Sequence, residues 1–239
     1  MIRAMRAAGV GHCVVNATSE ADWPAVEALA LAYPDFIYPA FGLHPWKAHT
    51  ATDGWAERLE TLLVNHPRSS IGECGLDGWI SSPPLEIQRR VFMAQLELAR
   101  KICRPVTIHC LKAWAPLFDV FTECSPPPRF LMHSFGGSIE IARRLISLGA
   151  YFSFSGHFLH SRKASVIEVF RQLPRERILL ETDAPDMRPP DEMITHPLTG
   201  ALNHPANLPA IGRALAAKLG LLPEDLAILT RANAAALFR

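Results

Sequence analysis

The sequence lacks the features that define several large classes of protein. No run of about 18 apolar residues occurs in the chain, so no membrane span is expected. The five cysteines form no CxxC pair, so neither a zinc ribbon nor a disulfide framework is indicated. Unpaired thiols in odd number are typical of a reducing compartment, and we expect a cytoplasmic protein.

An excess of either charge is also missing. The 24 lysines and arginines nearly balance the 23 aspartates and glutamates, which gives a net charge of +1. Proteins that clamp nucleic acid non-specifically need a basic excess that this chain does not have. A phosphate substrate is still compatible with a net charge near zero if a local group such as a metal ion neutralises the charge of the phosphate. Low-complexity segments and long linkers are absent from the sequence, and we expect a single domain over residues 1–239.

Short segments rich in β-branched and aromatic residues alternate with helical patterns along the chain. We expect strands at 12–18, 36–43, 70–76, 105–109, 129–133, 150–155 and 178–183. We expect helices at 1–8, 86–102, 138–148, 162–173, 206–219 and 224–237, with Ser138 capping the third of these. This alternation predicts an α/β fold of the (β/α)8 TIM-barrel type. Such a barrel has about eight strands, and because only seven are readable, we expect its first strand to be missing.

Residues that can bind a metal lie toward the ends of several predicted strands. They are Glu73, His109, His133 and Asp183, and His44 directly follows another strand. In a barrel of parallel strands the carboxyl ends form one mouth, so these side chains are expected to converge. Two imidazoles and two carboxylates suit a catalytic divalent cation, which lowers the pKa of a bound water toward ~7. With a bridging carboxylate, two cations could lie ~3.5–4 Å apart and clamp a phosphoryl group.

Two further residues near these strand ends have open interpretations. Glu181 shares a face of its strand with Asp183, so its side chain should point into the barrel. An unpaired carboxylate there is costly, which favours a residue that orients a neighbouring ligand or pairs with a cation over a catalytic acid. His157 follows the strand that ends near Ser155, and it either contacts substrate or is a loop histidine without a role.

At these residues the sequence resembles the TatD family of metal-dependent hydrolases, which are often described as deoxyribonucleases. The matching segments are GLHPW (42–46), IGECGLD (71–77), RPVTIHC (104–110), MHSFGGS (132–138), ETDAP (181–185) and NHPANLPAI (203–211). They occur in the family's order and the resemblance covers essentially the whole chain. IGECGLD and ETDAP together are specific signals, whereas GLHP alone would be weak.

The resemblance implies an amidohydrolase-like TIM barrel with one or two divalent metal ions, which could be Mg, Zn or Mn. Glu73 resembles the bridging carboxylate, and His109 and His133 resemble the imidazole ligands of one metal. Asp183 resembles the carboxylate that binds the other metal and handles the proton of the attacking water. His44 resembles a residue that lines the site for the substrate phosphate.

The sequence departs from the family in three places. Asn203 lies where the family has an Arg-Asn-Glu-Pro pattern, but the segment here reads Leu-Asn-His-Pro, which puts the substrate contacts of this position in doubt. Gly78 replaces an aromatic residue that is common after GLD. The His-x-His pair of the family's first strand is absent from the sequence. Either the chain starts at an internal methionine or the protein is truly shorter.

Three functions are compatible with these observations. The first is a divalent-metal-dependent phosphodiesterase acting on DNA or short nucleic acid, with Glu73 and Asp183 as catalytic residues and a preference for 3′ ends. The second is an amidohydrolase that cleaves an amide or an ester with the same metal site. The third is a catalytically impaired scaffold whose metal site is incomplete. Nothing in the sequence indicates a protein partner.

Overall fold

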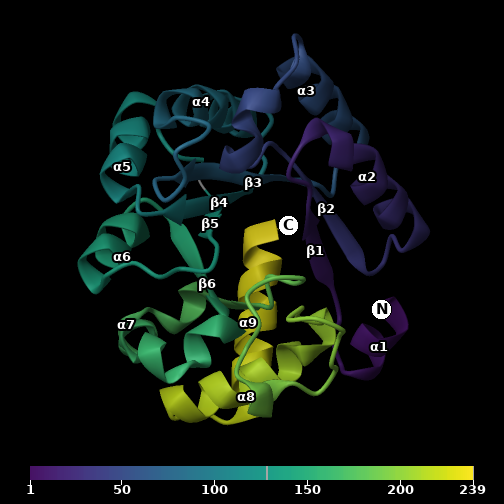
Figure 1. Ribbon diagram of the computed structural model, residues 1–239, viewed down its shortest axis with the longest axis vertical. Coiled ribbons are helices and arrows are strands. Elements are labelled where there is room, and N and C mark those ends of the chain that lie inside the picture. The colour runs from purple at the N-terminus through teal and green to yellow at the C-terminus, as the bar shows by residue number, and fades with distance from the viewer. Residues whose placement is uncertain (128, 239) are drawn as a thin grey trace. The chain divides into compact units, whose positions relative to one another are not determined.

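The computed structural model describes residues 1–127 and 129–238 (Figure 1). The chain forms two compact units. The larger unit contains residues 12–133 and 148–150 and the end of the chain from Leu237. The smaller unit contains residues 1–11, 134–147 and 151–236. The single domain expected from the sequence stays a prediction.

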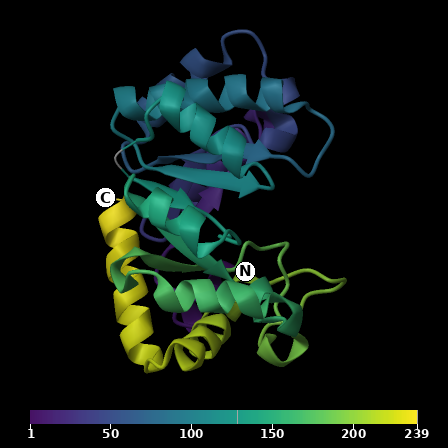
Figure 2. The ribbon, with the colours of Figure 1, turned by 90° about the vertical axis from the view of Figure 1, so that its left-hand side faces the viewer.

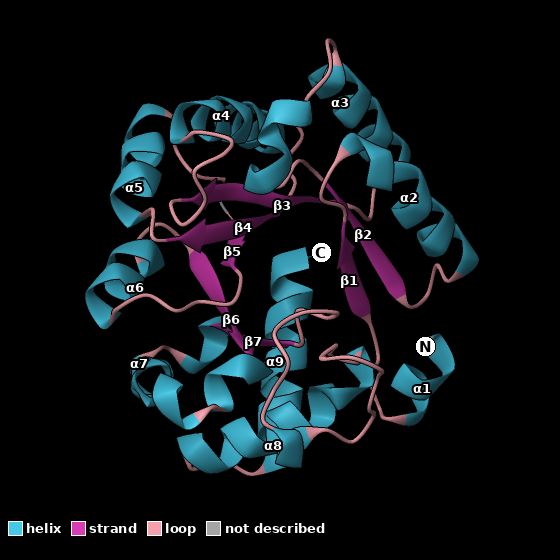
Figure 3. Ribbon diagram, viewed as in Figure 1, coloured by secondary structure: helices cyan, strands magenta, loops and turns pink. Residues whose placement is uncertain are grey.

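The larger unit is built on parallel strands that follow one another in chain order (Figure 3). These are β1 (Cys13–Asn16), β2 (Ile37–Phe41), β3 (Ser70–Asp77), β4 (Val106–Leu111) and β5 (Phe130–Met132). The helices between them are α2 (Trp23–Ala32), α3 (Trp55–Asn65), α4 (Leu85–Lys101) and α5 (Trp114–Glu123). This alternation of strand and helix is that of a parallel α/β fold.

The helices of the larger unit pack on its strands through apolar faces. Helix α4 contacts β3, and α5 contacts both β3 and β4; Figure 2 shows these teal helices over the strands. Val91 and Leu96 of α4 are buried, as are Ile71 of β3 and Ile108 of β4. The side chains of β2, β3 and β5 are almost continuously buried, which is typical of covered parallel strands, whereas those of β1 are only partly buried.

The smaller unit repeats the same alternation. Its strands β6 (Ala150–Ser155) and β7 (Ile178–Glu181) pair in parallel. Its helices are α1 (Ile2–Ala7), α6 (Ile139–Ile146), α7 (Ala164–Gln172), α8 (Leu208–Leu219) and α9 (Pro223–Phe238), the last of which ends in the larger unit. Ser138 accepts a hydrogen bond from the backbone N–H of Ile141, as expected for the cap of α6.

The seven strands expected from the sequence are all present among the described residues, with ends that differ by no more than two residues. The six expected helices are present as well. Helices α2, α3 and α5 were not predicted from the sequence. Of the helices in the described part of the chain, none is long and apolar enough to cross a membrane.

Strand β3 contains an irregularity in the segment that carries Glu73. Its register against β4 shifts between Ile71 and Cys74, so an extra residue is accommodated there. Gly75 lies just beyond with a φ of +140°, a value that side-chain-bearing residues rarely adopt. A Cβ at this position would lie 2.0 Å from the carbonyl oxygen of His109 on β4. Only glycine therefore allows β3 and β4 to approach so closely.

We expect Gly75→Ala to lower the free energy of unfolding by about 3 kcal/mol or more, because the added methyl group collides with backbone that cannot move aside. Urea denaturation followed by circular dichroism measures this change. Gly11→Ala is the matched control, since nothing lies within 4 Å of its Cβ. Equal stability of the two variants would contradict the close approach of β3 and β4.

Candidate metal centre

One carboxylate oxygen of the larger unit is surrounded by imidazoles. Oε1 of Glu73 lies 2.7 Å from Nε2 of His133. The same oxygen is 3.1 Å from Nδ1 of His109 and 3.1 Å from Nε2 of His44. The nitrogens of His109 and His133 are themselves 3.1 Å apart. We call Glu73, His44, His109 and His133 the histidine–glutamate cluster.

Neighbouring strands and the loops after them carry the four residues of this cluster. Glu73 is in the irregular part of β3, where its N–H donates to the carbonyl of Ala17 at 3.1 Å. His109 is on β4, and His133 directly follows β5. His44 begins the short 3-10 helix Pro45–Thr50 after β2. The four side chains are 8–14% exposed, so their charges interact with little screening by water.

A second carboxylate fixes the far side of the His109 ring. Oδ2 of Asp77 lies 3.0 Å from Nε2 of His109. Because a carboxylate accepts, Nε2 carries the proton and the neutral ring presents the lone pair of Nδ1 to Glu73 and His133. Asp77 is fully buried and also accepts from Nε1 of Trp46 at 2.7 Å and from the N–H of Trp79 at 2.8 Å. This is the arrangement of a carboxylate that orients a histidine ligand of a metal.

In His44 the nitrogen that faces away from Glu73 accepts a hydrogen bond, whereas in His109 it donates one. Its Nδ1 accepts a hydrogen bond from the backbone N–H of Trp46 at 3.2 Å. The proton of the neutral ring is therefore on Nε2, which points to Glu73 as a donor. A nitrogen that carries a proton has no lone pair to offer a metal. His44 thus fits a hydrogen-bond donor better than a metal ligand, although one potential ligand atom each from His44, Glu73 and His109 lies within 4.8 Å of the others.

The pKa values reflect these contacts. Burial alone would raise the pKa of Glu73, but the charge of His133 and the hydrogen bonds that protonated His109, His133 and His44 donate hold it well below its ordinary value. Burial favours neutral His44 and lowers its pKa. Burial also acts to lower the pKa of His109, yet its hydrogen bonds to Asp77 and Glu73 raise it.

The pKa of Asp77 responds to the same neighbours. Burial opposes its ionisation, but hydrogen bonds from His109, Trp46 and Trp79 lower its pKa to about 2. Asp77 and Glu73 are therefore both anionic at neutral pH. Two carboxylates facing one imidazole favour a positive charge there, carried either by a second proton on Nδ1 of His109 or by a cation bound to that nitrogen.

The donor set fits a divalent cation. Nδ1 of neutral His109 and an oxygen of ionised Glu73 are both electron-pair donors, and they face one another at 3.1 Å. Two such atoms repel unless a proton or a cation lies between them. Two imidazoles and a carboxylate are common ligands of zinc and other catalytic divalent ions. Glu73, His109 and His133 are the residues of the larger unit that could hold such an ion.

The smaller unit contains the remaining carboxylates singled out in the sequence. Asp183 lies two residues after β7 and has a left-handed φ of 53°, which is uncommon for aspartate. Glu181 ends β7 and accepts hydrogen bonds from the N–H of Ser134 at 2.8 Å and from the hydroxyls of Ser134 and Ser153. Glu181 thereby fixes the residue that directly follows His133 in the chain. The orienting role expected for Glu181 stays a prediction.

The smaller unit also contains His157 and Asn203, the two residues expected there to contact substrate. His157 is in the 3-10 helix Gly156–Leu159. Its pKa is lowered by burial and by the positive charges of Lys163, His160 and Arg162. Asn203 is fully buried, where its amide donates to the carbonyl of Thr182 at 2.8 Å and accepts from Asn207 at 3.1 Å. Asn203 therefore holds the backbone next to Asp183.

Sequence reasoning missed Asp77, Trp46 and Trp79. All three lie in or beside the matching segments GLHPW and IGECGLD, and the aspartate at the end of β3 obeys the same strand-end rule as Glu73. The signal was available for Asp77, but its role depends on which nitrogen of His109 it faces. That cannot be read from spacing.

Comparisons with known proteins agree with this geometry. The chain matches the family described as TatD related DNase over residues 1–239. The 3'-5' ssDNA/RNA exonuclease TatD of Edwardsiella piscicida is 33% identical to it over 236 residues, which cover 98% of this chain and 90% of the relative. The uncharacterized metal-dependent hydrolase YabD of Bacillus subtilis is 32% identical over 206 residues, which cover 86% of this chain and 78% of the relative.

A solved structure shows the same fold. The crystal structure of YjjV, a TatD homologue from Escherichia coli K12, matches with a TM-score of 0.89 and 29% sequence identity, covering 99% of this chain and 89% of that one. The predicted (β/α)8 TIM-type fold, with seven parallel strands among the described residues, is thereby confirmed.

We expect Asp77→Asn to weaken metal binding about 10- to 100-fold, because the amide no longer requires the proton of His109 to stay on Nε2. Equilibrium dialysis against Zn²⁺ and Mn²⁺ measures the change. Asp119→Asn, at an exposed position of α5, removes the same charge outside the cluster and serves as the control. Equal affinities of the two variants would show that Asp77 does not orient His109.

Proposed function

The chain belongs to the TatD family of metal-dependent hydrolases, and we propose on this basis that it removes nucleotides from the 3′ end of single-stranded DNA or RNA. The histidine–glutamate cluster is the observation that carries this proposal, since it supplies the ligands that such hydrolysis needs. The name of the Edwardsiella piscicida relative supports the same substrate class. The metal would be Mg²⁺, Zn²⁺ or Mn²⁺, one or two ions per chain.

Glu73, His109 and His133 would hold the ion. When bound, a divalent cation lowers the pKa of a water and neutralises the charge of a phosphate, which the near-zero net charge of the chain does not do. The hydrogen bond from His109 to Asp77 leaves Nδ1 without a proton in the neutral ring, so that this nitrogen would be available to the ion. Fixing the ligands in advance saves the cost of ordering them when the substrate binds.

His44 would contact the substrate phosphate. Its Nε2–H donor points to the same oxygen of Glu73 that the other imidazoles approach. This N–H group would donate a hydrogen bond to a non-bridging oxygen of the phosphate. This assignment rests on the tautomer set by Trp46, and it agrees with the role that the family resemblance implies.

Asp183 would accept the proton of the attacking water and bind a second ion. Its position just after a strand and its unusual backbone conformation support this role. Asn203 would act by holding the backbone at Thr182, next to Asp183, and would touch the substrate only through that loop. His157 would contact a phosphate of the substrate, because Arg162 and Lys163 add positive charge beside it.

Two exposed tryptophans would bind the unpaired bases. Trp79 is 66% exposed and Trp46 is 51% exposed, which is unusual for such large apolar side chains. Nζ of Lys112 lies 3.8 Å from the centre of the Trp79 ring. Single strands are typically bound by aromatic rings that stack on bases together with cations that face phosphates. Nε1 of Trp46 and the backbone N–H of Trp79 both donate hydrogen bonds to Asp77, which in turn contacts His109. Both tryptophans therefore lie at the rim of the histidine–glutamate cluster.

The five cysteines are all free thiols, which supports the cytoplasmic location expected from the sequence.

We expect one or two divalent ions per folded chain, measured by elemental analysis, and release of mononucleotides from the free 3′ end of 5′-labelled single-stranded DNA. Glu73→Gln and His109→Ala should lose bound metal and at least about 1,000-fold of the activity, because each removes a ligand. His49→Ala, an exposed histidine of the same unit, should change neither.

Other outcomes separate the alternative functions. Equal degradation of free and blocked 3′ ends would refute the exonuclease. Metal-dependent cleavage of esters or amides without cleavage of DNA would identify an amidohydrolase of another specificity. A folded chain that binds metal but hydrolyses none of these substrates, or that binds no metal, would be the impaired scaffold.

We expect Trp79→Ala to raise the KM for single-stranded DNA about 10-fold with an unchanged kcat, because a lost stacking contact weakens ground state and transition state alike. Leu31→Ala, which removes a side chain 67% exposed on α2, is the control. A fall in kcat at constant KM would instead place Trp79 in the reaction itself.

A further inference from the structure

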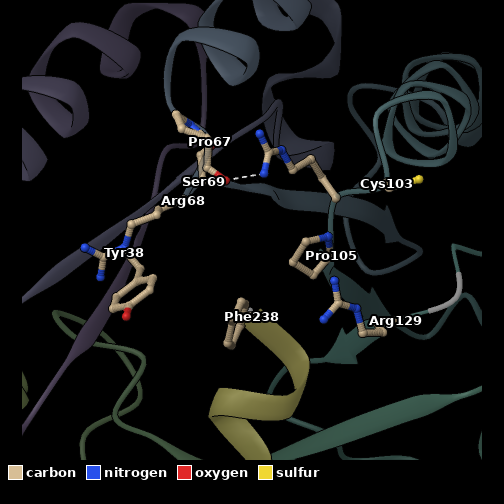
Figure 4. Close-up of a pocket in the computed structure, with 9 residues that line it drawn as sticks. Tyr38, Pro67, Arg68, Ser69, Cys103, Pro105, Arg129 and Phe238 are labelled. Carbon is tan, nitrogen blue, oxygen red and sulfur yellow. Dashed lines mark hydrogen bonds between the residues drawn. The ribbon is translucent and has the colours of Figure 1, made fainter.

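A pocket of about 410 Å³ lies at the amino ends of the strands in the larger unit (Figure 4). Ser69 and Pro105 directly precede β3 and β4, and Arg129 directly precedes β5. Glu73 and His109 lie further along the same strands, toward their carboxyl ends. The pocket is therefore a second concave site, separate from the histidine–glutamate cluster. Its volume is within the range of about 300–1,000 Å³ that is common for small-molecule sites.

The lining carries positive charge only. Three arginines, Arg68, Arg104 and Arg129, contribute to it, and no acidic residue does. The described contacts of Arg68 and Arg104 are with backbone carbonyls and a ring, so neither forms an ion pair with a described residue. A carbonyl oxygen orients a guanidinium but does not cancel its charge. An anion is the ligand that such a lining favours.

Two of these guanidinium groups are held in place before any ligand arrives. Arg104 donates to the carbonyls of Pro67 and of Leu63, the second at 3.3 Å. Arg68 donates to the carbonyl of Pro34 at 3.1 Å and lies 4.5 Å from the centre of the Tyr38 ring. Ordered side chains lose little conformational entropy on binding, which improves affinity.

The rest of the lining is aromatic and apolar. In Figure 4 the side chains of Tyr38, Phe238 and Arg129 lie around a common opening, with Pro105 beside them. A bare phosphate would leave most of this surface and most of the volume unused. A phosphate joined to a flat ring would use the arginines and the aromatic side chains together.

We propose that this pocket binds a nucleotide-sized phosphate ester, of which a nucleoside monophosphate is the simplest form. A phosphomonoester carries a charge of about −1.5 to −2 at pH 7, which the guanidinium groups of Arg68 and Arg104 can balance. The proposal does not depend on hydrolysis at the histidine–glutamate cluster. It assigns the pocket a ligand, and a binding measurement without turnover tests it.

The probe is labelled dAMP, measured by equilibrium dialysis against the metal-loaded protein and against His109→Ala. The second protein removes binding at the histidine–glutamate cluster. We expect one saturable dAMP per chain to persist in His109→Ala. Adding Arg68→Gln to His109→Ala should weaken it about 10-fold or more, because a charge-assisted contact is lost. Circular dichroism establishes that each variant is folded, and Arg129→Gln gives a second test at another wall of the pocket.

Arg90→Gln is the matched control, because Arg90 is exposed in the same unit and outside the pocket. Unchanged binding in this control supports the proposal, whereas an equal loss in Arg90→Gln and Arg68→Gln overturns it. Absence of dAMP binding in folded His109→Ala also overturns it. Inorganic phosphate that competes as well as dAMP would show a simple anion site, and an oligonucleotide that binds far more tightly would show a strand site. Either result overturns the nucleotide assignment.

Discussion

The chemistry of this chain depends on the crowding of three imidazoles around one carboxylate oxygen. Oε1 of Glu73 can accept only a limited number of hydrogen bonds, and the three histidine nitrogens within 3.1 Å of it include Nδ1 of His109, which presents a lone pair when that ring is neutral. Such a group of electron-pair donors is stable only with added positive charge. The fold imposes this condition, because each residue comes from a different strand or from the loop after it.

Different hydrogen-bond partners give His109 and His44 different tautomers. By accepting from Nε2 of His109, Asp77 leaves Nδ1 free to bind a cation, whereas the backbone N–H of Trp46 leaves His44 with a donor. Residues of the same type, a few ångströms apart, therefore have different chemistry. What distinguishes them is the partner of the nitrogen that faces away from Glu73.

The strands and most of the histidine–glutamate cluster could be predicted from the sequence. Short β-branched segments and one-sided helices gave the seven strands, and the rule that carboxyl ends of parallel strands converge brought Glu73, His109 and His133 together. The irregularity of β3, which sets where Glu73 lies, depends on how close β4 approaches and has no sequence pattern of its own. The arginine-lined pocket was missed because Arg68, Arg104 and Arg129 are far apart in the chain. Each comes within two residues of the start of a strand, and that regularity was the available signal.

The contacts of Asp77 also link two processes that are usually considered separately. The same buried carboxylate holds the backbone of Trp79, the indole of Trp46 and the ring of His109. Any ligand that shifts either tryptophan changes the hydrogen bonding of Asp77 and with it the basicity of His109. Thermodynamic reciprocity then requires that the occupancy of the metal site change the affinity for that ligand by the same factor. Under the function proposed above, binding of a nucleic-acid strand at the two tryptophans and binding of the metal ion would share one coupling free energy.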